Sequence, residues 1–338
     1  MPESFNHIQA AHCENGVTTS LLRYNGLDFM DEPLAFGIGA GLFYIHIPFI
    51  KINNGPGISF RSMPGNIFKN TCKSLDIRIN SKKFKNSETA QAFLDEKISK
   101  GIPVGCQVGV FHLKYFPVEY RFHFNAHNII IYGKDNDRYL ISDPVMEHTT
   151  SLSSKELERV RFAKGIFAPK GHIYYTEKAG NTDPEILKRA IIKGIKRNTR
   201  NMLYVPGNIA GVKGIRFTSN QIRKLLLKND LRNAGIYLAQ IVRMQEEIGT
   251  GGGGFRFIYA AFLEKAADYL KEDKLIAVSE DFTKAGDLWR SSAVQMAGIY
   301  KGRLTQQKDF DEIADMLLEI SEKEKSAFKK LSKLSFNK

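Results

Sequence analysis

The first half of the chain carries, in this order, a cysteine, a histidine and an aspartate of the kind that cooperate in nucleophilic catalysis. Cys13 lies at the start of a predicted helix, His127 at the start of a predicted strand, and Asp143 after the next strand. A helix N-terminus and a neighbouring imidazolium both favour the thiolate, which is the reactive form of cysteine. The imidazole then moves the proton, while a carboxylate fixes the orientation of the ring. These residues are therefore candidates for a nucleophile, a base and an orienting acid.

The elements that must position these side chains are a helix and a hairpin. The helix is predicted over Cys13 to Tyr24, with apolar residues at helical spacing and Gly26 just beyond its end. The hairpin joins an apolar strand starting at His127 to a strand ending at Ser142, through the turn residues 134–137. Such a hairpin brings His127 and Asp143 side by side. The order Cys, His, Asp with the nucleophile near the N-terminus indicates a papain-like arrangement.

A lone cysteine is also common as a small buried residue, and this alternative stays open for Cys13. Cys72 lies in a polar stretch and Cys106 in an apolar strand, and both are expected to be structural. Three cysteines do not suit a disulfide framework, so free thiols are expected.

The predicted elements change character near residue 180. Before it, helices and strands alternate; the further elements expected there are a helix at 87–100, a strand at 104–113, a helix at 154–163 and a strand at 172–176. After it, helices are expected at 219–227, 231–245, 255–271, 279–299 and 309–330. The sequence therefore predicts an α+β, papain-like domain over residues 1–180 and an all-α domain over residues 181–338.

Composition is ordinary for a globular protein, with 43% hydrophobic and 25% charged residues. The longest apolar stretch, Gly41 to Ile50, is interrupted by His46 and Pro48 and falls short of the roughly 20 residues of a membrane span. The N-terminal residues lack the pattern of a signal peptide, so a cytoplasmic protein with no membrane partner is expected.

Most of the net charge of +13 comes from one stretch, Glu185 to Arg232, with twelve Lys or Arg and two acidic residues. This stretch is either a solvated helical face or a surface for an acidic partner. Nucleic acid is not expected, because the stretch contains no recognised binding motif.

Two segments resemble the butirosin biosynthesis protein H N-terminal family. One contains His12-Cys13, Leu21 to Gly26 and Glu32 to Leu42; the other contains Gly101 to Val104, Ala126 to Gly133 and Ile141 to Pro144. The second segment is also similar to the His and Asp region of bacteriocin-processing, papain-like cysteine peptidases. The second half resembles a helical domain commonly attached to this family, through Gly251 to Tyr259, Phe262-Leu263 and Trp289.

The resemblance implies an acyltransferase, since the family's namesake moves an aminoacyl group from an acyl carrier protein thioester to an amine of an aminoglycoside. It matches Cys13 to the nucleophile, His127 to the base and Asp143 to the orienting acid. It therefore implies an acyl carrier protein or another acyl thioester as donor, and a small-molecule amine as acceptor. No cofactor is implied.

The second donor of an oxyanion hole is not apparent. Papain-like peptidases place a Gln about six residues before the cysteine, and His7 occupies that position here, while Gln9 is four residues before. Gln9 is a candidate donor or a surface residue, and His12 either tunes the thiol or lies at the surface. His123 is either a second histidine of the pocket or an ordinary polar residue. The residue types around Cys13 follow no zinc spacing, so no metal is expected.

The run Gly251 to Gly254 lacks the lysine of a phosphate loop. Gly253 and Gly254, with Arg256, could still present N–H groups and a charge to an anionic substrate or carrier. The alternative is a flexible connection.

Three functions follow: a cysteine-dependent acyltransferase acting through an acyl-S-Cys13 intermediate, a papain-like peptidase or amidase with the same residues, and a catalytically inactive binding module. The first two differ in whether an amine or water accepts the acyl group.

Overall fold

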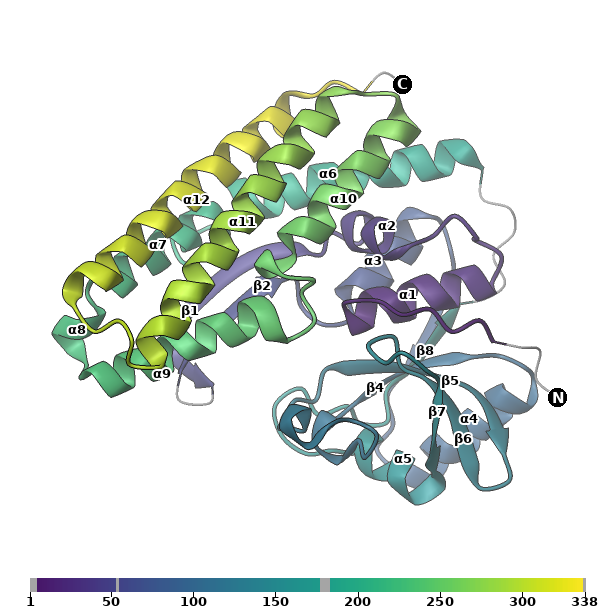
Figure 1. Ribbon diagram of the computed structural model, residues 1–338. Coiled ribbons are helices and arrows are strands. Elements are labelled where there is room, and N and C mark those ends of the chain that lie inside the picture. Colours follow the sequence, from purple (N-terminus) through teal and green to yellow (C-terminus); the bar gives the residue numbers. More distant parts are fainter. Residues whose placement is uncertain (1–4, 53–54, 177–182, 337–338) are drawn as a thin grey trace. The chain divides into compact units, whose positions relative to one another are not determined.

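The computed structural model describes residues 5–52, 55–176 and 183–336, and the chain divides into two compact units (Figure 1). The first unit contains Met1–Ala35 and Ile67–Ile186, and the second contains Phe36–Asn66 and Leu187–Lys338. This division differs from the predicted one, which places a single boundary after residue 180, because the segment 36–66 groups with the C-terminal helices. The division falls inside α2 (Glu32–Ile38).

The first unit is built on a six-stranded antiparallel sheet with the strand order β3-β8-β4-β5-β6-β7. Its strands are β3 (Ile79–Lys82), β4 (Val104–Val108), β5 (His127–Asp135), β6 (Arg138–Ser142), β7 (Thr150–Ser153) and β8 (Ile173–Thr176). The predicted hairpin is confirmed: β5 and β6 pair with Asp135 opposite Arg138, and Asn136 in the turn has a φ of 52°. This left-handed conformation is one that Asn tolerates better than most residues.

Helices cover both faces of this sheet (Figure 1). They are α1 (Cys13–Tyr24), α3 (Asn66–Ser74), α4 (Ser87–Ser99) and α5 (Ser154–Arg161). The helix predicted at Cys13 to Tyr24 is confirmed, and that at 87–100 is confirmed to within one residue. Asn86 caps α4, accepting hydrogen bonds from the N–H groups of Glu88 and Thr89.

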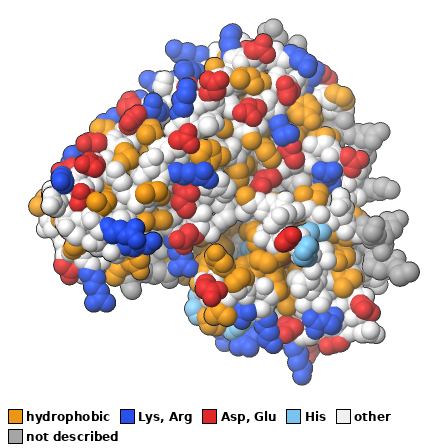
Figure 2. Space-filling view, viewed as in Figure 1, with side chains coloured by type: hydrophobic (Ala, Val, Ile, Leu, Met, Phe, Trp, Pro, Cys, Tyr) orange, Lys and Arg blue, Asp and Glu red, His pale blue; other side chains and the backbone are white. Residues whose placement is uncertain are grey.

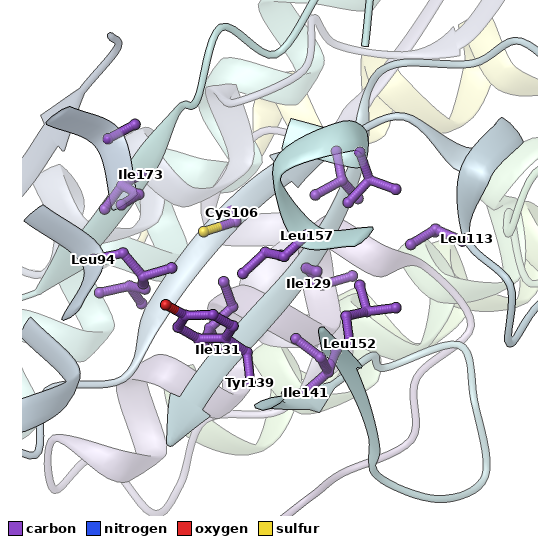
Figure 3. Packing of buried hydrophobic residues seen from close by; sticks show 14 of the residues in the cluster. Leu94, Cys106, Leu113, Ile129, Ile131, Tyr139, Ile141, Leu152, Leu157 and Ile173 are labelled. Carbon is purple, nitrogen blue, oxygen red and sulfur yellow. The ribbon is translucent and has the colours of Figure 1, made fainter. Parts of the chain in front are cut away.

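The core of the first unit lies between the sheet and the helices α4 and α5 (Figure 3). Side chains that alternate along the strands, including Cys106, Ile129 and Ile131, meet Leu94 of α4 and Leu157 of α5 there. Because successive side chains of a strand point to opposite faces, Gly105, Asn128 and Ile130 belong to the other face. The sheet thus separates an apolar core from a face that carries polar groups.

The strand predicted over 104–113 is wrong in its second half. β4 ends at Val108, and Val110–His112 form a 3₁₀ helix, followed by another at Val118–Tyr120. The Gly109 N–H donates to the Val160 carbonyl and the Val110 N–H to the Phe124 carbonyl, so the backbone leaves the strand ladder at this point.

The second unit combines a two-stranded antiparallel sheet with helices. The sheet contains β1 (Leu42–Ile52) and β2 (Gly55–Arg61), which were not predicted. The helices are α6 (Pro184–Leu203), α7 (Gly211–Arg223), α8 (Leu225–Lys228), α9 (Leu231–Val242), α10 (Arg256–Leu270), α11 (Lys274–Tyr300) and α12 (Gln307–Lys333). A π-helical turn, Arg243–Glu247, continues α9.

The last three predicted helices are confirmed as α10, α11 and α12, with ends that differ by up to five residues. The prediction at 219–227 is wrong in its bounds, because α7 begins at Gly211 and ends at Arg223. Trp289 of α11 is fully buried, and its ring contacts those of Tyr44 and Phe60 from the two strands. These aromatic contacts explain why the hairpin belongs to the helical unit.

Candidate active site

The thiol of Cys13 is carried by the first residue of α1. His12 caps this helix, because its backbone is extended and its Nδ1 accepts a hydrogen bond from the Asn15 N–H at 3.4 Å. Cys13 is 7% exposed and His12 is 4% exposed, so neither is an ordinary surface residue. The positive end of the helix dipole favours negative charge at this position.

The carboxylate of Glu32 holds the turn that precedes Cys13. One oxygen accepts from the Ala11 N–H at 2.9 Å; the other accepts from the His12 N–H at 2.8 Å and from Nδ2 of Asn15 at 3.2 Å. Burial raises the pKa of Glu32, while these hydrogen bonds oppose the shift. Glu32 was not among the predicted site residues, although it lies in the segment that carries the family resemblance.

α1 approaches the end of β6 closely. A Cβ atom on Gly16 would lie 2.3 Å from Cβ of Pro144, and the Ala10 N–H donates to the Pro144 carbonyl at 2.7 Å. Only glycine allows this approach, which places the start of α1 beside the residue that follows Asp143.

The imidazole of His127 lies against the carboxylate of Asp143. β5 begins at His127, and β6 ends immediately before Asp143, with Ile130 opposite Ser142 in the register of the hairpin. Nε2 of His127 is 2.7 Å from Oδ2 of Asp143, and both side chains are buried. This hydrogen bond leaves Nδ1 of the ring for the thiol of Cys13.

Cys13 and Asp143 together act on the charge of His127. Burial disfavours the imidazolium, but the negative charges of Asp143 and of the Cys13 sulfur, with hydrogen bonds to both side chains, raise the pKa of His127 from 6.5 to about 10. A charged imidazole beside a thiol is the pairing that makes cysteine nucleophilic. The structure therefore brings together the three residues that the sequence analysis singled out for catalysis.

Two further groups fix the carboxylate of Asp143. The Tyr115 hydroxyl donates to Oδ2 at 2.9 Å, and the Val145 N–H donates to Oδ1 at 3.2 Å. Burial and the charge of Asp143 raise the pKa of Tyr115 well above 10, so its hydroxyl stays protonated as a donor. Nothing in the spacing of Tyr115 distinguishes it in the sequence.

The side-chain amide of Asn128 lies next to the thiol. Its Nδ2 is 3.8 Å from Sγ of Cys13 and donates to the Ala126 carbonyl at 3.1 Å. Its Oδ1 accepts from the Tyr174 hydroxyl at 2.8 Å, which orients the amide so that its donor side faces the sulfur. Asn128 was missed because it follows His127 directly and suggested only a continuing strand.

The side chains of Gln9 and His7, which precede Cys13, differ in their surroundings. The side chain of Gln9 is exposed and makes no hydrogen bond within the described residues. Both ring nitrogens of His7 are engaged, Nδ1 with Oγ of Ser142 at 2.8 Å and Nε2 with the Met146 carbonyl at 3.1 Å. His7 thus anchors the N-terminal segment to the end of β6.

Gly253, Gly254 and Arg256 belong to a buried network of the second unit. Nε and Nη2 of Arg256 donate to Glu324 at 2.8 and 3.0 Å, and Nη1 donates to the Gly254 carbonyl. The Gly253 N–H donates to the carboxylate of Glu246. Since Arg256 is fully buried and its charge is paired, these contacts give the predicted substrate or carrier residues a structural role.

The other two cysteines are free thiols that are fully buried. Burial raises the pKa of Cys72, and raises that of Cys106 to about 11. No group of three or more potential metal ligands occurs within residues 5–52, 55–176 and 183–336. Over the same residues, no helix is long and apolar enough to cross a membrane.

A thiol at a helix N-terminus, packed on an antiparallel sheet that supplies a histidine and a carboxylate, defines a papain-like cysteine-enzyme domain. Residues 12–144 match the model of the family "Butirosin biosynthesis protein H, N-terminal", and residues 155–331 match that of a domain of unknown function (DUF4872). The second match covers more than half of the chain, so the chain belongs to the DUF4872 family, and its first half matches the butirosin family model. Cys13, His127 and Asp143 all lie within the first match.

Among solved structures, the chain is similar to a Bacillus anthracis protein described as a C39-like peptidase. The two share 15% sequence identity with a TM-score of 0.36, over 52% of this chain and 96% of the other. No curated protein sequence matches the chain.

Proposed function

We propose that the protein is an acyltransferase that moves an acyl or aminoacyl group from a thioester to an amine through an acyl-S-Cys13 intermediate. The observation that carries the proposal is the side-chain set Cys13, His127 and Asp143, in which His127 is hydrogen-bonded to Asp143 and has its pKa raised by both of the other residues. All three lie in one compact unit.

In the first step, the Cys13 thiolate attacks the carbonyl carbon of the donor thioester. The new S–C bond converts the carbonyl oxygen into an oxyanion, which needs preorganised donors. The backbone N–H of Cys13 and Nδ2 of Asn128 are the groups we assign to this task. When the intermediate collapses, the donor thiolate leaves and takes a proton from the imidazolium of His127.

In the second step, the nitrogen of the incoming amine attacks the acyl-S-Cys13 carbonyl. The now neutral His127 accepts a proton from this amine. Collapse forms the amide bond and releases Cys13 as a thiolate beside the imidazolium, which regenerates the starting state. Asp143 stabilises the imidazolium in both steps through the bond to Nε2. A thioester is as reactive as the donor it replaces, so no additional energy source is required.

The family supports the choice of donor and acceptor. Its name refers to butirosin biosynthesis, and this supports an acyl carrier protein as donor and a small-molecule amine as acceptor. The basic stretch Glu185 to Arg232 was one candidate surface for an acidic carrier. Part of its charge is neutralised, because Arg216 pairs with Glu322 and Arg223 with Asp315 of α12.

The surface of the second unit also carries acidic side chains next to its basic ones. On the face that Figure 2 shows, basic and acidic side chains are interspersed over α11 and α12. A face of mixed charge attracts an acidic carrier protein less strongly than a uniformly basic face does.

The test is the acylation of the protein by an N-acetylcysteamine thioester, followed by intact mass spectrometry. We expect the wild type to gain one acyl group, Cys13→Ala to gain none, and the matched variant Cys72→Ala to behave as the wild type. Addition of a primary amine should discharge the acyl group as an amide. Acyl transfer by Cys13→Ala at the wild-type rate would refute the proposal.

The same experiment separates the alternative functions. Rapid loss of the acyl group in buffer without amine indicates a hydrolase, because water then reaches the thioester. No acylation together with an unreactive thiol indicates a binding module.

A further inference from the structure

A cavity of about 470 Å³ lies on the first unit, beside α5. Lys155, Glu158 and Arg159 line one side of it from successive turns of the helix, and Lys164 adds to this side from the loop beyond. Residues three and four apart share a helical face, so these side chains point into the same space. We call this cavity the α5 pocket.

The α5 pocket carries unpaired positive charge. Among the described residues, Lys155, Arg159 and Lys164 have no carboxylate within ion-pairing distance. The acidic residue on the neighbouring side of α5, Glu156, is paired with Lys114 at 2.8 Å and hydrogen-bonded to Ser153. Only Glu158 brings negative charge to the lining, against three permanent cations.

Two histidines also line the pocket. His112 lines the pocket from the 3₁₀ helix that follows β4, and His123 lies near it. Burial and the positive charges of Arg159 and His123 lower the pKa of His112. The basic side chains around this space therefore disfavour a proton on His112.

The pocket also has an apolar wall. The ring of Phe111 stacks on that of His123, with centroids 4.1 Å apart and planes at 10°, and Phe162 and Ala163 also line the pocket. A ligand that combines an anionic group with an uncharged, apolar part would match both the basic and the apolar side chains of the lining.

One lining residue of the pocket is close in the chain to the candidate base. Asn125, which lines the pocket, is two residues from His127, so the two Cα atoms lie at most about 7 Å apart. Asn125 donates from Nδ2 to the carbonyls of Lys164 and Ile166, both at 3.0 Å, which ties the loop after α5 to the start of β5. Asn125 thus connects the loop that carries Lys164 to the residues just before the candidate base.

We propose that the α5 pocket binds the phosphate of a phosphopantetheine arm while its thioester is attacked by Cys13. This inference rests on the proposed function and names the feature by which the donor is recognised. Lys155, Arg159 and Lys164 contact the phosphate oxygens, and Phe111 and Phe162 contact the branched methyl groups next to the phosphate. Both coenzyme A and acyl carrier proteins present this arm, and the experiment distinguishes them.

The first measurement is direct binding to Cys13→Ala by calorimetry, which needs no turnover. We expect phosphopantetheine to bind at least about tenfold more tightly than pantetheine, because a charged hydrogen bond contributes more than a neutral one. The double variant Lys155→Gln/Arg159→Gln should lose this preference, and Lys85→Gln, an exposed lysine outside the pocket, should keep it. Equal binding of phosphopantetheine and pantetheine, or a preference that survives in the double variant, would overturn the inference.

The second measurement compares acyl donors that share one acyl group. In the wild type, kcat/KM for the acyl-phosphopantetheine relative to the N-acetylcysteamine thioester should exceed one, and this ratio should fall at least about tenfold in the double variant. If acyl-coenzyme A is the best donor, the natural donor is coenzyme A. If a loaded carrier protein is a better donor, the natural donor is an acyl carrier protein. A ratio unchanged by the double variant contradicts the inference, whereas transfer that survives in Cys13→Ala contradicts the proposed function.

Discussion

Nε2 of His127 lies 2.7 Å from Oδ2 of Asp143, and the same carboxylate oxygen accepts the Tyr115 hydroxyl at 2.9 Å. Two donors therefore converge on one oxygen of a fully buried carboxylate. This arrangement restricts rotation of the imidazole, because turning the ring would leave the charge of Asp143 with less compensation. The remaining ring nitrogen is held toward Cys13.

Asp143→Asn should abolish most of the activity without loss of the fold. The amide can still accept a hydrogen bond but no longer stabilises the imidazolium, and kcat is expected to fall by a factor on the order of 10²–10⁴. Steady-state kinetics with the N-acetylcysteamine donor measure the effect, with Asp28→Asn as an exposed control. Near wild-type kcat in Asp143→Asn would show that the carboxylate has no catalytic role.

The stability of the protein should depend on pH through His127. Its pKa is raised by Asp143 and Cys13 from 6.5 to about 10 in the folded state. The charged ring therefore stabilises the fold fully below about pH 6.5, and this contribution is lost as the pH rises through about 10. Urea unfolding of the wild type and His127→Gln over this range should show the wild type's advantage decreasing with pH. A difference that stays constant would mean that His127 is not charged in the folded state.

Tyr115→Phe should lower kcat more than it changes KM. The substitution removes only the hydroxyl that donates to Asp143, and loss of about 1.4 kcal/mol of transition-state stabilisation corresponds to a tenfold lower rate. The pH profile of kcat should shift as well, since Asp143 is less firmly held. Tyr120→Phe, at an exposed position, is the control. A loss of stability with an unchanged kcat and pH profile would assign Tyr115 to folding alone.

Iodoacetamide at neutral pH should modify Cys13 faster than Cys72 and Cys106. The latter two are fully buried, and burial raises their pKa values, whereas Cys13 lies beside a charged imidazole. Peptide mass spectrometry over time gives the rate at each site, and His127→Ala should slow the reaction at Cys13 alone. Three equal rates would remove the main support for a nucleophilic thiol.

The elements that carry the candidate catalytic residues were predictable because their signals are local. The periodicity of Cys13 to Tyr24 and the turn residues between β5 and β6 depend on neighbours within a few positions. The residues that support them were not predictable. Tyr115 meets Asp143 across 28 positions, and Glu32 meets Ala11 across 21. No spacing rule connects such pairs, because the fold alone determines their contact.

The division into units shows the same limit. Leu42, Tyr44 and His46 alternate as buried residues along β1, yet their burial depends on Trp289 and other side chains from far along the chain. An apolar run with one histidine and one proline gave no indication that it would join the C-terminal helices. A contiguous boundary was therefore the natural expectation from the sequence.

Glu32→Gln should slow the reactions of Cys13 without touching the catalytic groups. The carboxylate accepts three hydrogen bonds from the turn and side chains around Ala11, His12 and Asn15, and an amide keeps only one accepting oxygen. At least one N–H then faces an NH₂ group, which should cost about 1–3 kcal/mol of stability and shift the start of α1. Alkylation of Cys13 and kcat should both decrease, and Glu119→Gln, an exposed substitution, should change neither. If Glu32→Gln destabilises the protein but Cys13 is alkylated at the wild-type rate, then Glu32 supports the fold and does not position the thiol.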